Sequence, residues 1–398
     1  MCGRGLLVLA AVLGTSAAQA AQVFYQPLAS LGVENDSNLD MDPGGSKAVQ
    51  GYLADVATVV GIDTPEWSTL LRPRLVYRSY PKSSVDDRLE TYLDLSSSYK
   101  TQRSIASLAA SYQHLDEINA QFAPPTFNDI VPNQPAPTNS RVATGATQDT
   151  AFLSPKYVYS FTPTIGAGVS GNYEDVRYSP SDGSSHQNFD YYQGRAFLNY
   201  ALNFTSTLTF GGMGSKFQTK EVDSQATGSG ALVDLTTLWT PLLTTVEELN
   251  YQHTKLDSSF PSPIDASVNK IGGFVDVSYK TELDRFRLVA RRSIAPSGGA
   301  AVYTTDRLQL QCDRTLTARF AITGAVSYIH TRGLTQGLSG EDSRYAQALV
   351  EAHYDLTRYL FLQGGYQYAY QRYRADPTSA ENNRVYVEIG YKGLAPQR

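Results

Sequence analysis

The sequence has few residues of the kinds that form disulfides, metal centres or membrane-spanning helices. Its 398 residues include 2 Cys, 3 Met and 2 Trp. Cys2 lies in the N-terminal segment discussed below, so Cys312 would be the one thiol of a processed chain. A single thiol excludes an internal disulfide and a Cys-based metal site.

Long apolar runs are also absent. No window after residue 20 approaches the 18 consecutive apolar residues that a membrane-spanning helix requires. A membrane role, if the chain has one, must therefore be built from strands. The formal net charge of −5 argues against a nucleic-acid partner, because such proteins are typically strongly basic.

Residues 1–20 have the pattern of a signal peptide. Arg4 precedes an apolar core from Leu6 to Leu13, and Ala18-Gln19-Ala20 forms a small-residue cleavage site. The alternative is a buried N-terminal helix, which the shortness of the apolar core disfavours. We predict a signal peptide at 1–20 and a mature chain at 21–398.

Tyr and Gly are abundant, with 27 and 31 residues, and apolar side chains alternate with polar ones over long runs. In RYLFLQGGYQYAYQRY (358–373), Leu362 and Tyr366 fall on one parity and Gln363 and Gln367 on the other. A period of two is typical of strands with one apolar and one polar face. We predict strands at 27–39, 48–62, 66–80, 87–99, 103–116, 148–162, 164–178, 189–203, 206–220, 226–240, 243–257, 267–281, 284–297, 302–313, 317–332, 343–356, 358–374 and 383–393.

Short and long connections alternate between these strands. Thr162-Pro163 and Thr357-Arg358 are tight, whereas 179–188 and 333–342 are longer and rich in Gly, Ser and Asp. Short periplasmic turns and longer outer loops produce this alternation in a bacterial barrel. The sequence therefore predicts an all-β fold, a transmembrane antiparallel up-and-down β-barrel of about 18 strands (16–18) in the outer membrane.

Three other β folds are disfavoured. A soluble sandwich or jelly roll has shorter strands, and a β-helix or β-propeller would show a repeat of fixed period. The longest connection, 116–147, is either a constriction folded into the lumen or a disordered outer loop.

The polar parity of the strands would face the lumen, where basic side chains outnumber acidic ones. Arginines at 72, 74 and 78 should pair with Glu90 and Asp94 of the next strand, whereas those at 285, 287 and 291 should meet Arg307 in a positive patch. Either group could instead be a wall ladder that stiffens the barrel. The predicted basic lumen residues are Arg72, Arg74, Arg78, Arg195, Arg285, Arg287, Arg291, Arg307 and Arg319, and the acidic ones are Asp36, Asp40, Glu90, Asp94 and Glu351.

The acidic stretch ENDSNLDMDPGG (34–45) has oxygen-bearing side chains two residues apart. An EF-hand loop that began at Asp36 would need Gly at position 41 and Glu at position 47, where Met41 and Lys47 stand. We therefore predict an acidic, lumen-facing strand end, with weak calcium binding as the alternative. In a second acidic stretch, adjacent Glu247 and Glu248 predict a β-bulge or a register shift, because one of them would otherwise face lipid.

No motif predicts catalysis. GGMGSK (211–216) lacks the phosphate-loop spacing, and the five His residues have no metal-ligand companions. We expect no cofactor, no metal and no enzymatic activity, although a Ser–His pair formed across strands would make the protein an outer-membrane hydrolase.

Two segments carry a family resemblance. Asn35-Asp36-Ser37-Asn38-Leu39, together with the stretch from Arg291 to Leu310, resembles the outer-membrane beta-barrel porin 2 family. Members of that family are associated with exopolysaccharide or exosortase-type systems. The resemblance implies an outer-membrane barrel with a part in polysaccharide export and with no assigned catalytic residues.

These observations predict a pore or conduit for polysaccharide or other polar solutes. Its expected partners are outer-membrane lipids, a polysaccharide or small polar solute, and a periplasmic export partner. The alternative is a non-conducting scaffold that anchors a periplasmic or surface partner.

Overall fold

A computed structural model of the chain shows the arrangement of its strands. The described residues are 21–43, 48–81, 87–116, 119–120, 126–127, 146–179, 186–220, 222–258, 264–299, 301–334, 342–373 and 378–393. The predicted signal peptide lies outside them. Within these ranges, no helix has the length and apolar character needed to cross a membrane.

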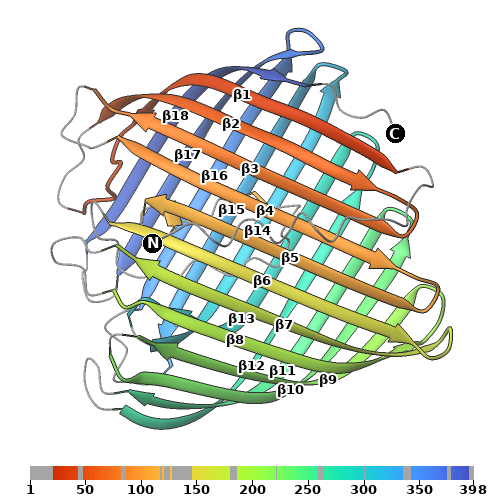
Figure 1. Ribbon diagram of the computed structural model, residues 1–398. Helices are drawn as coiled ribbons and strands as arrows, with labels where there is room; N and C mark the ends of the chain where they lie inside the picture. Colours follow the sequence, from red (N-terminus) through yellow and green to blue (C-terminus); the bar gives the residue numbers. More distant parts are fainter. Residues whose placement is uncertain are drawn as a thin grey trace, which may run out of the picture.

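The strands form one closed antiparallel sheet of 18 members (Figure 1). Each strand pairs with the next along the chain, and β1 pairs with β18 from Leu28 opposite Lys392 to Asp36 opposite Arg384. The strands are β1 (Gln22–Asp36), β2 (Val49–Asp63), β3 (Trp67–Ser79), β4 (Arg88–Lys100), β5 (Ser104–Asp116), β6 (Thr147–Ser160), β7 (Ile165–Tyr178), β8 (Phe189–Ala201), β9 (Ser206–Thr219), β10 (Ser224–Thr240), β11 (Leu243–Ser258), β12 (Ile264–Lys280), β13 (Asp284–Ser297), β14 (Ala301–Thr317), β15 (Phe320–Gly333), β16 (Ser343–Asp355), β17 (Leu360–Tyr373) and β18 (Ser379–Lys392). The predicted barrel of about 18 strands is confirmed.

Threonine side chains organise most of the short turns. Thr101 Oγ1 accepts a hydrogen bond from the N–H of Ser104, the first residue of β5, at 2.9 Å. The same contact joins Thr281 to Asp284 at 2.8 Å. Equivalent bonds occur at Thr64, Thr162, Thr240, Thr317 and Thr357. Because a Thr hydroxyl stabilises a turn in this way, each such residue fixes where the next strand begins.

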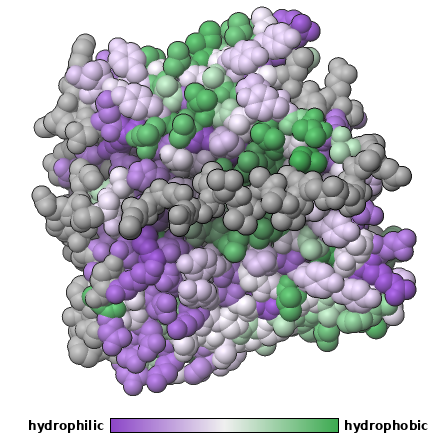
Figure 2. Space-filling view, in the orientation of Figure 1, coloured by the Kyte–Doolittle hydropathy of each residue, from purple (hydrophilic) through white to green (hydrophobic). Residues whose placement is uncertain are grey.

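The two faces of the wall differ in polarity. Leu31 and Val33 of β1 are exposed on the outside of the barrel. Glu34, the next residue of the strand, points to the inside and is only 4% exposed. Figure 2 shows apolar side chains spread over the outer wall, and hydrophilic ones gathered at the end with the longer connections, on the left. A closed barrel satisfies its backbone hydrogen bonds internally, and its apolar outside can face lipid.

The prediction of a bulge or a register shift at Glu247 and Glu248 is wrong. Glu247 lies opposite Leu235 and Val275 in an uninterrupted register, and it is exposed on the outside. It is four residues from the start of β11, near the short turn, where a carboxylate on the lipid side costs less than at the midplane.

Candidate functional site: the barrel lumen

The barrel encloses a cavity of about 1340 Å³. Charged and amide side chains from the inner parity of many strands line it. Ten of the predicted site residues are among its lining: Arg72, Arg74, Arg78, Arg195, Arg287, Arg291, Arg307, Glu90, Asp94 and Glu351. The remaining four, Asp36, Asp40, Arg285 and Arg319, lie outside this lining.

The arginines of β3 are neutralised by carboxylates of adjacent strands. Arg72 contacts Asp94 of β4 at 2.6 Å. Arg74 donates to both carboxylate oxygens of Asp55 of β2, at 2.6 Å and 3.0 Å. Each guanidinium therefore has a partner in a neighbouring strand, and the three strands are cross-linked along the inner wall.

Glu34 is the centre of a second network, at the seam where β1 meets β18. Its carboxylate accepts hydrogen bonds from Tyr80 at 2.7 Å and from Arg384 of β18, and Arg78 lies at 3.7 Å. Arg78 also pairs with Glu90 at 2.6 Å. The Glu34 side chain is 1% exposed, so this network links the closing strands to β3 and β4 in a site with little access to water.

The acidic segment does not extend the strand as we predicted. β1 ends at Asp36, whose oxygens accept hydrogen bonds from the N–H of Asn38 at 3.0 Å and from the amide of Asn382 at 3.0 Å. Asp40 lies in the turn that follows and pairs with Arg88 at 3.2 Å. These carboxylates are thus used in structural contacts, and no three His, Cys, Asp or Glu side chains of the described ranges come together as a metal site requires.

Met41 continues this turn in a left-handed conformation, with φ of 49°. Its buried side chain packs against Ile329, Tyr345, Ala369 and Ala380, which belong to β15, β16, β17 and β18. The described part of the connection after β1, residues 37–43, therefore folds over one end of these four strands. This is the end of the barrel at which the longer connections lie.

Arg291 and Arg307 form a pair of cations with no carboxylate partner among the described residues. They lie directly opposite each other on β13 and β14. Arg307 donates to the amide oxygen of Gln309 at 2.8 Å, and Arg291 lies over the Phe274 ring, 5.0 Å from its centroid. The Nε of Arg307 is buried without a hydrogen-bond partner. Like charges directly across a strand pair repel, so this pair favours an anion between or beside the two guanidinium groups.

Arg195 and Arg287, in contrast, have partners. Arg195 of β8 reaches Glu248 of β11 at 2.7 Å, and Arg287 pairs with Asp276 of β12 at 2.7 Å. Gly230 occupies the strand row between Arg195 and β11, where a Cβ would lie only 2.2 Å from the Tyr251 carbonyl oxygen. A side chain at this position would therefore collide with the backbone of β11.

Parts of the connection between β5 and β6 lie inside the barrel. Asn119, Ala120, Thr126 and Phe127 line the cavity. Asn119 donates to Glu90 on β4. The N–H of Phe127 donates to Gln311 on β14 at 2.8 Å, and Arg287 stacks over its ring, 4.4 Å from the centroid.

β4 and β14 lie on opposite walls of the 18-strand ring. The described residues of this connection therefore contact both walls. The sequence left a constriction and a disordered loop open as alternatives, and these contacts favour the constriction.

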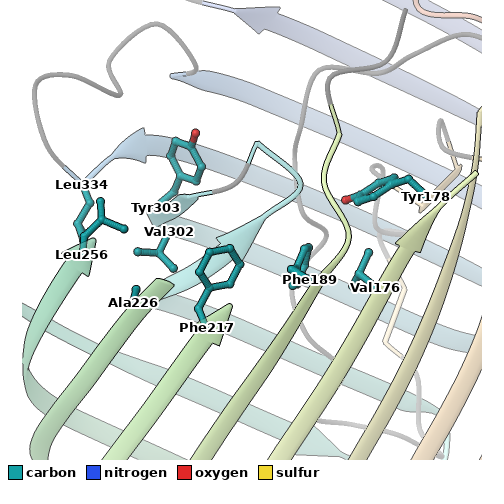
Figure 3. Close-up of a cluster of buried hydrophobic side chains, with 9 residues drawn as sticks. All are labelled: Val176, Tyr178, Phe189, Phe217, Ala226, Leu256, Val302, Tyr303 and Leu334. Atoms are coloured by element: carbon teal, nitrogen blue, oxygen red, sulfur yellow. The ribbon is translucent and has the colours of Figure 1, made fainter. Parts of the chain in front are cut away.

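An apolar cluster narrows the outer end of the lumen (Figure 3). Val302 and Tyr303, at the start of β14, pack against inward-facing residues of β7 to β11, and β14 contacts β10 across the barrel. The hairpin of β13 and β14 also accepts a hydrogen bond at the Gly298 carbonyl from the N–H of Gln187, at 2.8 Å. The wall members of the cluster are Val176, Tyr178, Phe189, Phe217, Ala226 and Leu256, and Leu334 follows β15. The sequence reasoning missed this cluster, although its members from β7 to β11 are apolar residues on the otherwise polar parity.

Two predicted lumen residues have other positions. Arg319 lies exposed in the turn between β14 and β15, so its prediction as a wall residue is wrong. The predicted strand 302–313 ends too early, because β14 continues to Thr317, with a register shift between Thr315 and Thr317. Arg285 shares the inner parity of Arg287 and lies opposite Asp313, near the short-turn end of β13.

A closed barrel with an apolar outside and a polar inside is the architecture of proteins that span the bacterial outer membrane. This chain is an outer-membrane β-barrel.

No protein-family model matches the sequence, and no curated protein matches it. The resemblance to the outer-membrane beta-barrel porin 2 family therefore stays a prediction.

Several solved structures are similar to this chain at low sequence identity. OccAB3 of Acinetobacter baumannii is 11% identical, with coverage of 93% of this chain and 99% of that chain and a TM-score of 0.43. OccK2 (OpdF) of Pseudomonas aeruginosa, solved in complex with glucuronate, is 12% identical, with coverage of 94% and 98% and a TM-score of 0.42. BauA, the ferric preacinetobactin receptor of A. baumannii, is 10% identical, with coverage of 92% and 80% and a TM-score of 0.41. Because the sequence identities are only 10–12%, we infer function from the residues of this chain alone.

Proposed function

We propose that the protein is an outer-membrane channel for small polar solutes that carry negative charge. The observation that supports this most directly is the Arg291–Arg307 pair, which faces the cavity and has no carboxylate partner in the described wall. Rings or pairs of basic side chains in a pore favour anions. The arginines of β3 are less suited to this role, because Asp55, Asp94 and Glu90 already neutralise them.

Anionic sugars are the solutes that fit this lining best. Amide side chains and tyrosines border the same cavity and can hydrogen-bond to hydroxyl groups. Among them are Gln193, Gln252, Gln309, Gln347, Gln363, Tyr92 and Tyr386. Passage would be passive and would require no catalytic residue.

Passage of a polysaccharide, which the family resemblance implies, is the second candidate. The amide and tyrosine lining favours it, but a polymer needs a wider path than one narrowed by Phe127 and by the β13–β14 hairpin. Export would also require a periplasmic partner that delivers the polymer. The channel proposed for small anions needs neither a displaced constriction nor a partner.

The test is ion selectivity in planar bilayers under a salt gradient. We expect the wild-type channel to be more permeable to anions than to cations. In the double variant Arg291→Gln/Arg307→Gln, the ratio of anion to cation permeability should fall about fivefold. This corresponds to ~1 kcal/mol, the interaction of two unit charges 4 Å apart in water.

Arg292→Gln is the matched control for this experiment. Arg292 is the next residue on β13, but its side chain pairs with Asp306 on the outside of the barrel. Its replacement should leave selectivity unchanged. Equal selectivity in the wild type and the double variant would contradict the anion site, and channels that never open would favour the anchoring scaffold.

A further inference from the structure

A row of charged side chains, interrupted by one histidine, follows the outside of β13 to β17. Successive members lie directly opposite each other in the strand register. Neighbouring positions of the same parity, Tyr328, Val350 and Tyr366, are exposed apolar residues of the outer wall. The members of the row are, in order, Arg292, Asp306, His330, Arg344 and Arg372.

The row lies near the end of the barrel that carries the longer connections. Arg344 is the second residue of β16, and Arg372 is the last but one of β17. The exposed Val350 and Tyr366 lie six residues further along these strands, towards the short turns. Because longer loops are extracellular and the apolar band lies in lipid, the row is at the level of the outer-leaflet head groups.

The charges of this row are not balanced. Arg292 and Arg332 share Asp306, each at 2.5 Å. Arg344 and Arg372 are exposed and directly opposite each other, and neither side chain forms an ion pair or hydrogen bond with the described part of the chain. Two like charges in this position destabilise the strand pair unless an anion joins them.

We propose that Arg344 and Arg372 bind a phosphate group on the head of an outer-leaflet lipid. The planar guanidinium group forms paired hydrogen bonds with phosphate oxygens, which makes arginine the preferred side chain for such a contact. The acyl chains of the same lipid would lie against the exposed apolar residues below the row. The partner is thus a phosphorylated lipid anchored in the membrane and not a soluble anion.

Among the described residues, the outer rim on the other side of the barrel lacks this excess of positive charge. Asp175 and Asp190 there contact Arg177 and Lys220 over distances from 2.5 to 3.8 Å. Asp149 contacts His114 at 2.8 Å. Lipid phosphate should therefore bind at the β16–β17 sector in preference to the β6–β8 sector.

The experiment measures lipid binding by the purified full-length protein in detergent. Lipopolysaccharide, enzymatically dephosphorylated lipopolysaccharide and inorganic phosphate are titrated separately, and bound lipid is counted by native mass spectrometry. We expect tight binding of the phosphorylated lipid alone. The variant Arg344→Gln/Arg372→Gln should bind it about thirtyfold more weakly, which corresponds to ~2 kcal/mol for two charges near an anionic lipid surface.

Lys216→Gln/Lys255→Gln is the matched control for charge. These lysines lie on the outer parity of β9 and β11, both opposite Thr227, so they are two strands apart and not adjacent. This variant should keep wild-type affinity. Equal affinity in the arginine variant, equal losses in both variants, or inorganic phosphate bound as tightly as the lipid would each overturn the proposal. Heat-modifiable migration on gels checks that every variant is folded.

Discussion

Replacing Glu34 by Gln is expected to lower the free energy of unfolding by about 3 kcal/mol, since removal of one charge from a buried ion pair typically costs 3–5 kcal/mol. The Glu34 side chain is 1% exposed and accepts hydrogen bonds from Tyr80 and Arg384. Gln keeps the shape but leaves the Arg384 guanidinium without a counter-charge at the β1–β18 seam. Urea unfolding in lipid vesicles, followed by the fluorescence of Trp67 and Trp239, measures the change.

Glu247→Gln is the control for this stability prediction. Glu247 is also a strand glutamate, but its side chain is exposed on the outside and forms no ion pair or hydrogen bond with any described residue. Its replacement should therefore change the free energy of unfolding by less than about 0.5 kcal/mol. A loss as small for Glu34→Gln would contradict the prediction. It would mean that lumen water solvates Arg384 well enough to replace the carboxylate.

The strands were predictable because two local signals agree along the chain. Alternation of polar and apolar residues gives strand type and the two faces of the wall, and the threonine turns give the strand starts. Local pairing also explains why the contact between Arg72 and Asp94 could be predicted, since these residues lie directly opposite each other in one hairpin. The residue patterns that specify a strand, its turn and its pairing with the next strand thus lie within one hairpin of about thirty residues.

Contacts between distant segments could not be read in this way. Glu34 and Arg384 lie at opposite ends of the sequence, and only closure of the barrel brings them together. The contact of Phe127 with Gln311 depends on a connection that enters the lumen, a path that no periodicity encodes. The sequence also counts Arg291 and Arg287 as equivalent, whereas Asp276 neutralises only Arg287.

The apolar cluster shows a different limit. Val176, Phe217 and Leu256 are inward-facing residues near the outer ends of their strands, where the parity rule predicts polar side chains. The rule assumes that the lumen contains water along its whole length. At the outer end, the side chains at the start of β14 occupy this space instead of water. Apolar residues on the inner parity are therefore buried against them, which is favourable.

Two structural elements thus narrow the lumen, and they are expected to differ in their effect on conductance. Phe127 contacts Arg287 and Gln311 in the cavity, at the wall opposite the strand that Asn119 contacts. The β13–β14 hairpin, in contrast, is packed against one side of the barrel by its apolar cluster. The connection between β5 and β6 therefore has the larger predicted influence on the open path.

Deletion of residues 120–145 is expected to raise single-channel conductance severalfold, because an 18-stranded barrel without internal segments leaves an aqueous channel. The matched variant Asn119→Ala/Phe127→Ala keeps the full chain length but removes the Asn119 hydrogen bond to Glu90 and the contact of the Phe127 ring with Arg287. Of the described wall contacts, only the backbone hydrogen bond from the N–H of residue 127 to Gln311 remains. The weakened connection should leave its place in the lumen more often than the wild-type one. It should produce frequent transitions between low and high conductance in planar bilayers. Unchanged conductance after the deletion would contradict the constriction and would make the hairpin of β13 and β14 the limiting element. In that case Val302→Ser/Tyr303→Ser, which weakens its apolar contacts, should be the variant that opens the channel.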